Sequence, residues 1–423
     1  MPWLGKMPAH WEAIKTKYVF RERVQKGYPK ESLLAATQTK GVVPKSIYEN
    51  RTVEAQKDLH LLKLVETGDF VISLRSFQGG IEYAYYRGII SPAYTVIVPN
   101  KRILPAYFRH LGKSKKFISL LQTCVTGIRE GQNINYAILR KTPIPVPTEE
   151  EQTQIARFLD WKTAQINKFI RNKRRLIELL KEQKQNVINQ AVTRGLDPKV
   201  KFKPSGVEWI GDIPEHWEVR RLKFLARIRN GQDYKEVEAE SGYPVMGSGG
   251  QFAYSSAFMY EGESVLFGRK GTIDKPLYIN GRFWTVDTMF YTEVSKLVSA
   301  KFLYFSALSF PFDYYSTKTA LPSMTQQDLG NHPVALPPRD EQELIIQYIE
   351  EESQLIDQTI SRAQREMDLM REYRTRLISD VVTGQVDVRN VKCEGGSLNE
   401  DEFEDIEEVE EEIELPEGGE DDE

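Results

Sequence analysis

The sequence has few of the residues from which disulfide frameworks and metal sites are built. Its 423 residues include two cysteines, Cys124 and Cys393, and five histidines. Two thiols so far apart in the sequence form neither a disulfide framework nor a zinc cluster, and the histidines lack the spacing of metal ligands. We therefore expect no metal site, a core role for Cys124, and a reducing, cytoplasmic location.

Long hydrophobic runs are missing as well. No apolar run reaches the roughly 18 residues that a membrane-spanning helix requires. The first residues, MPWLGKMPAHWE, have neither the basic region nor the apolar region of a signal peptide. The sequence therefore predicts a protein with no membrane partner.

The motifs of nucleotide-binding and methyl-transferring enzymes are also absent. The chain has no G-x-x-x-x-G-K-[ST] loop, no G-x-G-x-x-G loop and no Asp/Asn-Pro-Pro-aromatic tetrad. Two acid-x-Lys pairs, Asp160 with Lys162 and Glu182 with Lys184, resemble nuclease motifs. Both pairs fall in a predicted helix, where residues i and i+2 point to different faces. We expect them to be solvated charges, and we predict no catalytic residue.

Acidic residues are concentrated at the end of the chain. Of its 57 bases and 61 acids, one base and 17 acids lie in residues 392–423, so the preceding 391 residues hold 56 bases and 44 acids, a net charge of +12. A basic body suits a polyanion such as DNA, although a soluble surface alone also accounts for this charge. The composition of the tail predicts disorder. It is either an inert solubilising segment or a DNA mimic that competes for the basic body.

The chain is an internal duplication. WLGKMPAHWE at 3–12 returns as WIGDIPEHWE at 209–218, displaced by 206 residues. PIPVPTEEEQTQIARFLD at 143–160 returns as PVALPPRDEQELIIQYIE at 333–350, and this displacement of 190 residues holds as far as DVVTGQVD at 380–387. Each copy therefore consists of a shared first segment, a variable region and a long shared segment.

Each variable region contains short runs rich in β-branched and aromatic residues, punctuated by glycine and proline. These runs are FVISL (70–74), YTVIV (94–98), SVLFG (264–268) and TMFYT (288–292). Such runs are typical of strands that end in turns. The pattern predicts one β-rich globular domain in each copy.

A long helix is predicted at the end of each copy, because residues 148–194 and 339–383 contain no glycine or proline. Acidic residues in the first turn favour a helix start at both places. Apolar residues recur at the spacing of a heptad seam. In the first helix the seam is Ile155, Leu159, Ile166, Ile170, Ile177, Leu180 and Val187. In the second it is Ile345, Ile349, Ile356, Ile360, Met367, Met370 and Leu377.

The charges of the two predicted helices have opposite signs. The net charge is +4 over residues 148–194 and −5 over residues 338–384. Opposite charges favour pairing of one helix with the other over pairing of either helix with itself. We therefore predict a coiled coil within one chain, with helices of about 70 Å at 1.5 Å per residue.

The duplicated order resembles the specificity subunits of type I restriction–modification systems. Two copies of W-x-G-x-x-P-x-H-W carry the resemblance, each followed by a variable β-rich region and a long helix, and it extends over about residues 3–390. The exit motif A-V-T-x-G-x-D after the first helix matches too. So do the residues that begin the two helices: Glu150, Glu151, Gln152 and Ile155, and Asp340, Glu341, Gln342 and Ile345.

The resemblance implies an α+β fold in which two pseudo-twofold-related, β-rich target recognition domains are joined by two long helices that form an antiparallel coiled coil. The expected boundaries are 1–146 for the first target recognition domain, 147–197 for the first helix and exit linker, 198–336 for the second domain, 337–390 for the second helix, and 391–423 for the acidic disordered tail.

The resemblance also implies partners. Double-stranded DNA would be read as an asymmetric bipartite site, one half by each domain. Two methyltransferase subunits would dock on the helices, and motor-nuclease subunits would join outside them. We expect S-adenosylmethionine on the methyltransferase partner and no cofactor in this chain.

Base edges in the major groove are best read by Arg, Lys, Asn, Gln and Ser. In the loops of the first domain, such residues are Arg75, Gln78, Arg129, Gln132 and Asn133. In those of the second domain they are Ser248, Gln251, Arg269, Lys270, Lys318, Ser323 and Gln326. Arg75 and Arg269 align, since they follow G-D-F-V and G-E-S-V segments. For Lys270 and Lys318 we expect phosphate contacts rather than base contacts.

Two other functions remain open at this point. A DNA-recognition subunit of another restriction–modification class would share the variable domains, although a fused enzyme of that kind should contain its methyltransferase or nuclease motif. A coiled-coil adaptor without a DNA role would use the variable domains for protein ligands. For His10 and His216, which the duplication repeats, we expect a packing or capping role rather than catalysis.

Overall fold

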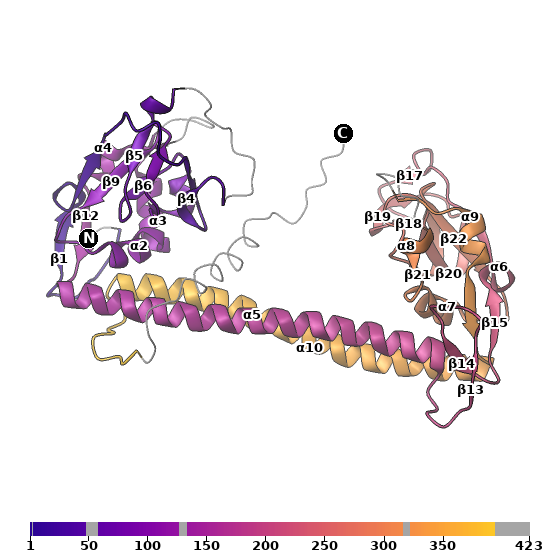
Figure 1. Cartoon of the computed structure of the whole chain (residues 1–423). Coiled ribbons are helices and arrows are strands. Elements are labelled where there is room, and N and C mark those ends of the chain that lie inside the picture. The colour runs from indigo at the N-terminus through magenta and orange to yellow at the C-terminus, as the bar shows by residue number, and fades with distance from the viewer. Residues whose placement is uncertain (2, 48–57, 127–132, 316–321, 394–423) are drawn as a thin grey trace. The chain divides into compact units, whose positions relative to one another are not determined.

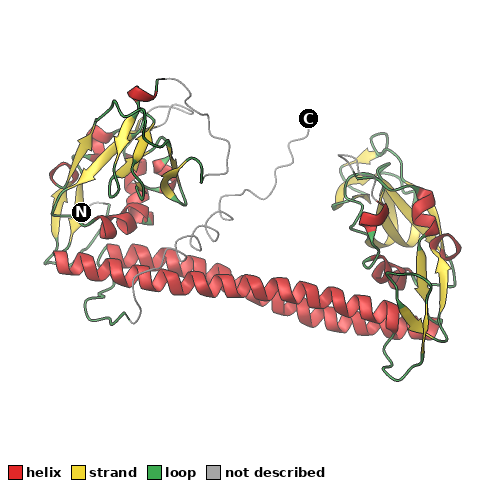
Figure 2. Ribbon diagram, in the orientation of Figure 1, coloured by secondary structure: helices red, strands yellow, loops and turns green. Residues whose placement is uncertain are grey.

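The computed structural model describes residues 1, 3–47, 58–126, 133–315 and 322–393 (Figure 1). The chain divides into two compact units, Met1–Arg174 with Gln364–Glu423, and Arg175–Ala363. Each unit contains one variable domain and a part of both long helices. Figure 2 shows helices and strands in both units, which confirms the predicted α+β class.

A two-stranded antiparallel ladder closes each variable domain. In unit 1, β1 (Glu12–Lys15) pairs with β12 (Pro143–Val146). In unit 2, β15 (Glu218–Arg221) pairs with β23 (Pro333–Leu336). The shared first segment thus lies beside the proline-rich segment that precedes each long helix. The variable region of each copy lies between these two strands in the sequence.

Each variable domain has a four-stranded antiparallel arrangement of the same topology. In unit 1 the order is β2 (Phe20–Arg23), β9 (Thr95–Pro99), β6 (Phe70–Ile72) and β7 (Glu82–Tyr83). In unit 2 it is β16 (Ala226–Asn230), β22 (Met289–Val294), β20 (Tyr260–Gly268) and β21 (Leu277–Thr285). The four predicted strand runs all fall in these strands, because β-branched and aromatic residues suit a pleated, buried surface.

The two domains differ in what is added to this sheet. Unit 2 extends its sheet with β18 (Tyr243–Gly247), β19 (Gly250–Ser255) and β17 (Glu238–Ala239), and β18 pairs with β21 in parallel. Unit 1 instead forms separate two-stranded sheets: β3 (Leu34–Thr37) with β4 (Gly41–Pro44), β5 (Lys63–Val65) with β8 (Gly88–Ile90), and β10 (Val125–Thr126) with β11 (Asn133–Ile134). The variable regions therefore differ in structure as well as in sequence.

Short helices complete both domains. Unit 1 contains α1 (Ser76–Gly79), α2 (Pro105–Lys113), α3 (Lys115–Thr123) and α4 (Tyr136–Leu139), with 3-10 turns at Thr16–Tyr18 and Leu59–Leu61. Unit 2 contains α6 (Leu222–Leu225), α7 (Ala300–Ala307), α8 (Phe312–Tyr315) and α9 (Gln326–Asn331), and a ladder of β13 (Phe202–Pro204) with β14 (Asp212–Pro214).

The two long helices are α5 (Glu149–Arg194) and α10 (Arg339–Val382). In each unit, parts of the two helices run side by side in opposite directions (Figure 1). In unit 1 the Arg374 guanidinium donates to Oδ1 of Asn167 at 2.9 Å, and Lys173 pairs with Glu366 at 2.7 Å. The α10 number falls as the α5 number rises, so the packing is antiparallel as predicted.

The predicted seam residues lie inward. Ten are buried: Ile155, Leu159, Ile166, Ile170, Ile177, Ile345, Ile349, Ile356, Met367 and Leu377. The other four, Leu180, Val187, Ile360 and Met370, are half-buried.

The helix ends also belong to the domain cores. In unit 1, Ile155 and Leu159 join the core cluster that contains Trp11 and the core thiol of Cys124. In unit 2, Ile345 joins the equivalent cluster around Trp217. Each domain and its part of the helices therefore share one hydrophobic core.

Candidate nucleic-acid interface

In the first domain, the turn after β6 carries two of the predicted DNA-reading residues. Arg75 precedes α1 and Gln78 lies within it, and both side chains are exposed. The backbone N–H of Ser73 donates to Oγ of Ser76 at 2.9 Å. This side chain–backbone bond holds the turn, so Arg75 projects from an ordered part of the chain.

Strand β11 brings a third predicted residue, Asn133, next to α1. Strand β11 contacts α1, and its first residue, Asn133, is exposed. The turn after α1 also approaches α2 closely, because a Cβ on Gly80 would lie 2.3 Å from the carbonyl oxygen of Gly112. Glycine, whose φ is +89° here, is the residue that permits this approach. The predicted residues Arg129 and Gln132 lie outside the described residues.

In the second domain, three predicted segments are tied together around one turn, residues 286–288, which joins β21 to β22. These segments are the hairpin at 247–251, the GRKG loop at 268–271 and the segment at 322–326. The backbone bonds are Arg269 N to Thr288 O at 2.8 Å, Met324 N to Arg269 O at 3.1 Å, and Val286 N to Met246 O at 3.2 Å. One edge of the sheet therefore collects most of the predicted reading residues.

Arg269 is held by its surroundings at this edge. Its guanidinium donates to the carbonyl oxygen of Asp287 at 3.3 Å and lies 6.0 Å from the centroid of the Phe290 ring. No carboxylate of the described residues forms a salt bridge with it. The remaining donors of the guanidinium are available to an external acceptor such as guanine.

The other predicted residues of this domain differ in their exposure and in the hydrogen bonds that they already make. Lys270 and Gln251 are exposed, and Ser248 and Ser323 are half-buried. Lys270 forms an isolated β-bridge with Ser323. Gln326 is exposed, but its amide group is already bonded to the protein, since Nε2 donates to the carbonyl oxygen of Ile228 at 2.8 Å. Lys318 lies outside the described residues.

Arg75 and Arg269 hold the same topological position. Arg75 follows β6 and Arg269 follows β20, and these are the third strands of the two equivalent orders. The alignment of the two arginines from the sequence is therefore consistent with the fold. Their surroundings differ, because a short helix follows Arg75 and a glycine-bounded loop contains Arg269.

Each domain is attached to its long helix by a buried glutamine. Gln152 and Gln342 are 2% and 0% exposed. Gln152 accepts from Leu104 N at 2.7 Å and donates to the carbonyl oxygens of Arg102 and Pro147, both at 3.0 Å. Gln342 accepts from Ser299 N at 2.8 Å and donates to those of Leu297 and Pro337 at 3.1 and 2.9 Å. The sequence indicated these glutamines as part of a helix-start motif, but not this role.

The preceding glutamate of each helix binds the shared first segment. Nε2 of His10 lies 2.9 Å from Oε2 of Glu151, and Nε2 of His216 lies 2.8 Å from Oε2 of Glu341. The Trp217 indole also donates to Glu341 at 3.1 Å. Both histidines thus fasten the first segment to the helix, in agreement with the packing role predicted for them.

The expectation that Asp160 is a solvated charge was wrong. Its carboxylate contacts Nε2 of His110 at 2.7 Å and the guanidinium of Arg109 at 2.6 Å, and both partners lie on α2. The sequence concealed this because the partners are some 50 residues away. Glu350, displaced from Asp160 by 190 residues, pairs in the same way with Lys301 of α7 at 2.6 Å.

The ion pairs around Asp160 are partly buried, and this changes their pKa values. Burial raises the pKa of Asp160, but hydrogen bonds and positive charge from His110 and Arg109 outweigh it, so the pKa lies below its ordinary value. Burial lowers the pKa of His110 despite its bond to Asp160. The cluster therefore holds α2 against α5.

Among the described residues there is no group of three or more His, Cys, Asp or Glu that could hold a metal ion. Nor does any helix in the described ranges have the length and apolarity required to cross a membrane. Two domains of one topology, each clamped to a shared helix pair and each presenting an arginine at the same strand end, define a duplicated recognition scaffold.

Comparison with known proteins identifies the family to which this scaffold belongs. Residues 8–182 and 214–364 each match the family model described as the type I restriction modification DNA specificity domain. The two matches cover more than half of the chain, which therefore belongs to the specificity subunits of type I restriction–modification systems. The MjaVIII specificity subunit of Methanocaldococcus jannaschii is 24% identical over 360 residues, 78% of this chain and 81% of the relative. The EcoKI specificity subunit of Escherichia coli is 29% identical over 157 residues, 36% of this chain and 31% of the relative.

Solved structures agree with this fold. A chain from a study of complex assembly and conformational transition of the type I R-M system has a TM-score of 0.71 and 16% identity, covering 90% of this chain and all (100%) of that one. The HsdS subunit from Thermoanaerobacter tengcongensis has a TM-score of 0.55 and 16% identity, covering 90% of this chain and 98% of its own.

Proposed function

We propose that the two variable domains of this specificity subunit read the two halves of an asymmetric, bipartite DNA site. The observation that carries this proposal is the pair Arg75 and Arg269, which follow equivalent strands but lie in segments of different sequence and structure. Equivalent positions favour one docking mode on DNA, and different loops favour different base sequences. A duplicated reader sets a geometric spacing between half-sites.

The predicted contacts divide into base readers and phosphate binders. Arg75, Gln78 and Asn133 form the reading surface of the first domain, and Arg269 and Gln251 that of the second, because these side chains project from ordered edges of the sheets. Lys270 supplies a phosphate contact, since an ammonium group lacks the planar fork that pairs with guanine.

The proposal assigns no chemistry to this chain itself. Two methyltransferase subunits dock on the helices and hold S-adenosylmethionine, motor-nuclease subunits join outside them, and the complex works in the cytoplasm. The repeated helix starts support two equivalent docking places. Methyl transfer to DNA by the homogeneous chain with S-adenosylmethionine would contradict this part.

Domain exchange with methylation mapping tests the bipartite reading. Residues 12–142 are replaced by the equivalent domain of another specificity subunit, and the methylated sites of the assembled complex are sequenced. This segment begins with β1 and ends just before β12, so Gln152 and Pro147 stay in place, and the incoming domain supplies the other main-chain partners of the glutamine. One half of the methylated site should change and the other should stay. A change in both halves would exclude independent readers.

A further inference from the structure

The hairpin of β18 and β19 in unit 2 contains an irregularity next to the predicted reading residues. Val245 pairs with Ala253, but the following pair is Met246 with Gln251. Phe252 is therefore opposite no residue of β18, and it forms a β-bulge. Bulges next to functional sites turn a side chain out of the regular alternation of a strand. In agreement with this, the consecutive residues Gln251 and Phe252 are both exposed.

The Phe252 ring is held in place although much of it is exposed. A Cβ on Gly247 would lie 3.1 Å from Cε1 of the ring, so the ring lies close to the backbone of that glycine. The Tyr234 ring packs against it at 89°, with centroids 5.3 Å apart. With both contacts made, 57% of Phe252 remains exposed. The hairpin thus presents an apolar surface in a defined orientation.

This ring belongs to the edge of unit 2 that collects the predicted reading residues. Its neighbour Gln251 pairs with Met246, and the carbonyl oxygen of Met246 is bonded at 3.2 Å to the 286–288 turn. The loop that contains Arg269 is bonded to the same turn. Phe252 therefore lies at the edge from which Arg269 and Gln251 are proposed to read bases.

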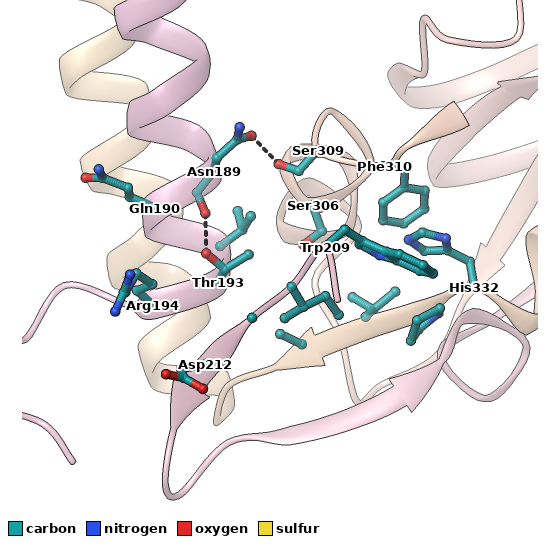
Figure 3. Close-up of a pocket in the computed structure, with 16 residues that line it drawn as sticks. Asn189, Gln190, Thr193, Arg194, Trp209, Asp212, Ser306, Ser309, Phe310 and His332 are labelled. Atoms are coloured by element: carbon teal, nitrogen blue, oxygen red, sulfur yellow. Dashed lines mark hydrogen bonds between the residues drawn. The ribbon is translucent and has the colours of Figure 1, made fainter. Parts of the chain in front are cut away.

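Trp209, another exposed ring of unit 2, is already engaged by the chain itself. It lines a pocket of about 300 Å³ together with Phe310 and His332 (Figure 3). The His332 ring stacks on it with centroids 5.8 Å apart, and the centroid of the Tyr314 ring is 5.6 Å away. Trp209 thus contributes to the packing of its own domain, whereas Phe252 keeps a surface for an external group.

The chemistry of the major groove indicates which external group this is. Among the groups that base pairs expose there, the C5-methyl group of thymine is the apolar one. The other use of an exposed phenylalanine, insertion between base steps, takes place from the minor groove. The bidentate pairs of Arg269 with guanine and of Gln251 with adenine form in the major groove. The neighbours of Phe252 therefore favour the methyl group.

We propose that Phe252 is a specificity-determining residue that contacts the C5-methyl group of a thymine in the half-site read by unit 2. The hairpin of β3 and β4 in unit 1 has neither a register shift nor an aromatic residue, so this contact is specific to one half-site. The assignment rests on the proposed function, because it takes this edge of unit 2 as the surface that meets DNA.

Removal of single methyl groups from the DNA tests the contact. Each thymine of the site that the assembled complex methylates is replaced in turn by deoxyuridine, which lacks only the C5-methyl group. The dissociation constant of the complex is measured for every duplex. For the wild type we expect one replacement in the half-site of unit 2 to weaken binding about threefold to fivefold, as the loss of one buried methyl-sized group does. Phe252→Ala should bind the thymine and deoxyuridine duplexes of this position equally.

Two further variants separate the contact from other effects of the substitution. Phe252→Leu keeps an apolar side chain and should keep a preference for thymine at this position. Phe224→Ala removes a phenylalanine of similar exposure (60%) on α6, outside the segments tied to the 286–288 turn, and should show the full wild-type preference. All three variants change an exposed residue, and thermal unfolding verifies that they are folded.

Three results would overturn the proposal. The first is a thymine preference that Phe252→Ala leaves intact, and the second is a wild-type complex that no single replacement weakens. The third is equal weakening of every duplex by Phe252→Ala, which would make Phe252 a contact to the sugar–phosphate backbone. Failure of the bipartite reading would appear instead as a change in both halves of the site after the domain exchange. The replacement series is separate from that result, since it includes every thymine of the methylated site.

Discussion

Gln152 and Gln342 make the same three hydrogen bonds in the two units: each bonds one backbone N–H and one backbone carbonyl oxygen of its domain, and the carbonyl oxygen of a proline just before its helix. All six partners are main-chain groups, so the attachment does not depend on the side chains of the variable domain. A domain of different sequence can therefore be held in the same way, provided that its backbone follows the same path.

We expect Gln152→Met to lower the free energy of unfolding of unit 1 by about 1–3 kcal/mol, because methionine fills the space but leaves a buried N–H and two carbonyls unpaired. Gln342→Met should do the same in unit 2. Denaturant unfolding monitored by circular dichroism measures both. Gln183→Met, at an exposed position of α5, is the control and should change stability by no more than about 0.5 kcal/mol. Equal stability of all three variants would mean that the glutamines do not attach the domains.

The sequence predicted the helices well because their signals are local. The range 148–194 became α5 (Glu149–Arg194), and 339–383 became α10 (Arg339–Val382). A heptad of apolar residues without glycine or proline leaves few alternatives. The internal duplication supported both helix predictions, since each helix of one copy has a counterpart in the other copy.

What the sequence could not predict depends on contacts between distant segments. Asp160 resembled an exposed helix charge, and its partners on α2 are not indicated by any motif. Gln152 contacts main-chain groups, which have no sequence signature. The reading loops were predicted from residue type alone. Residue type does not distinguish Gln251, which is free to contact DNA, from Gln326, whose amide group bonds the carbonyl oxygen of Ile228.

The helix seam gives a second prediction. Ile170 is 0% exposed, and Ile170→Asp places an unpaired carboxylate in the core of the helix pair. This should cost several kcal/mol of stability and prevent docking of the methyltransferase subunit. Asn172→Asp, two residues further along at an exposed position, is the control. Co-elution of the Ile170→Asp chain with the methyltransferase subunit in size-exclusion chromatography would contradict the prediction.

His332 gives a pH dependence. Burial lowers its pKa to about 3, whereas an unfolded chain has an ordinary histidine pKa of about 6.5. Between these values the unfolded state binds a proton that the folded state does not, so stability falls as the pH drops below 6.5. From pH 7 to pH 5 the wild type should lose about 2 kcal/mol more than His332→Phe, which keeps a ring between Trp209 and Phe310. Parallel pH profiles of unfolding free energy would exclude this histidine as the cause.

The acidic tail gives a prediction from charge alone, since residues 394–423 lie outside the described residues. Its 17 acids can compete with DNA phosphates for the basic body, and salt screens this attraction. Deleting 392–423 should tighten binding to random duplex at low salt and steepen its salt dependence, while the methylated site stays the same. Superimposable binding curves across a salt series would identify the tail as a solubilising segment.

The two equivalent arginines give the sharpest test of DNA reading. An arginine that contacts guanine contributes about 1–3 kcal/mol of discrimination, so Arg269→Ala should weaken specific binding by the assembled complex about tenfold to a hundredfold. It should also relax the sequence preference at one position of one half-site. Arg75→Ala should do this in the other half-site.

Two further variants separate base reading from charge. Lys270→Ala should weaken binding to all sequences alike and reduce the salt slope by about one. Arg220→Ala removes an exposed arginine that is engaged with Glu218 on β15, outside the three segments tied to the 286–288 turn, and should leave binding and preference unchanged. Binding of random-sequence libraries followed by sequencing measures every variant. If Arg269→Ala lowers affinity uniformly without relaxing any position, Arg269 is a phosphate contact, and the second half-site is read by other residues of the same sheet edge.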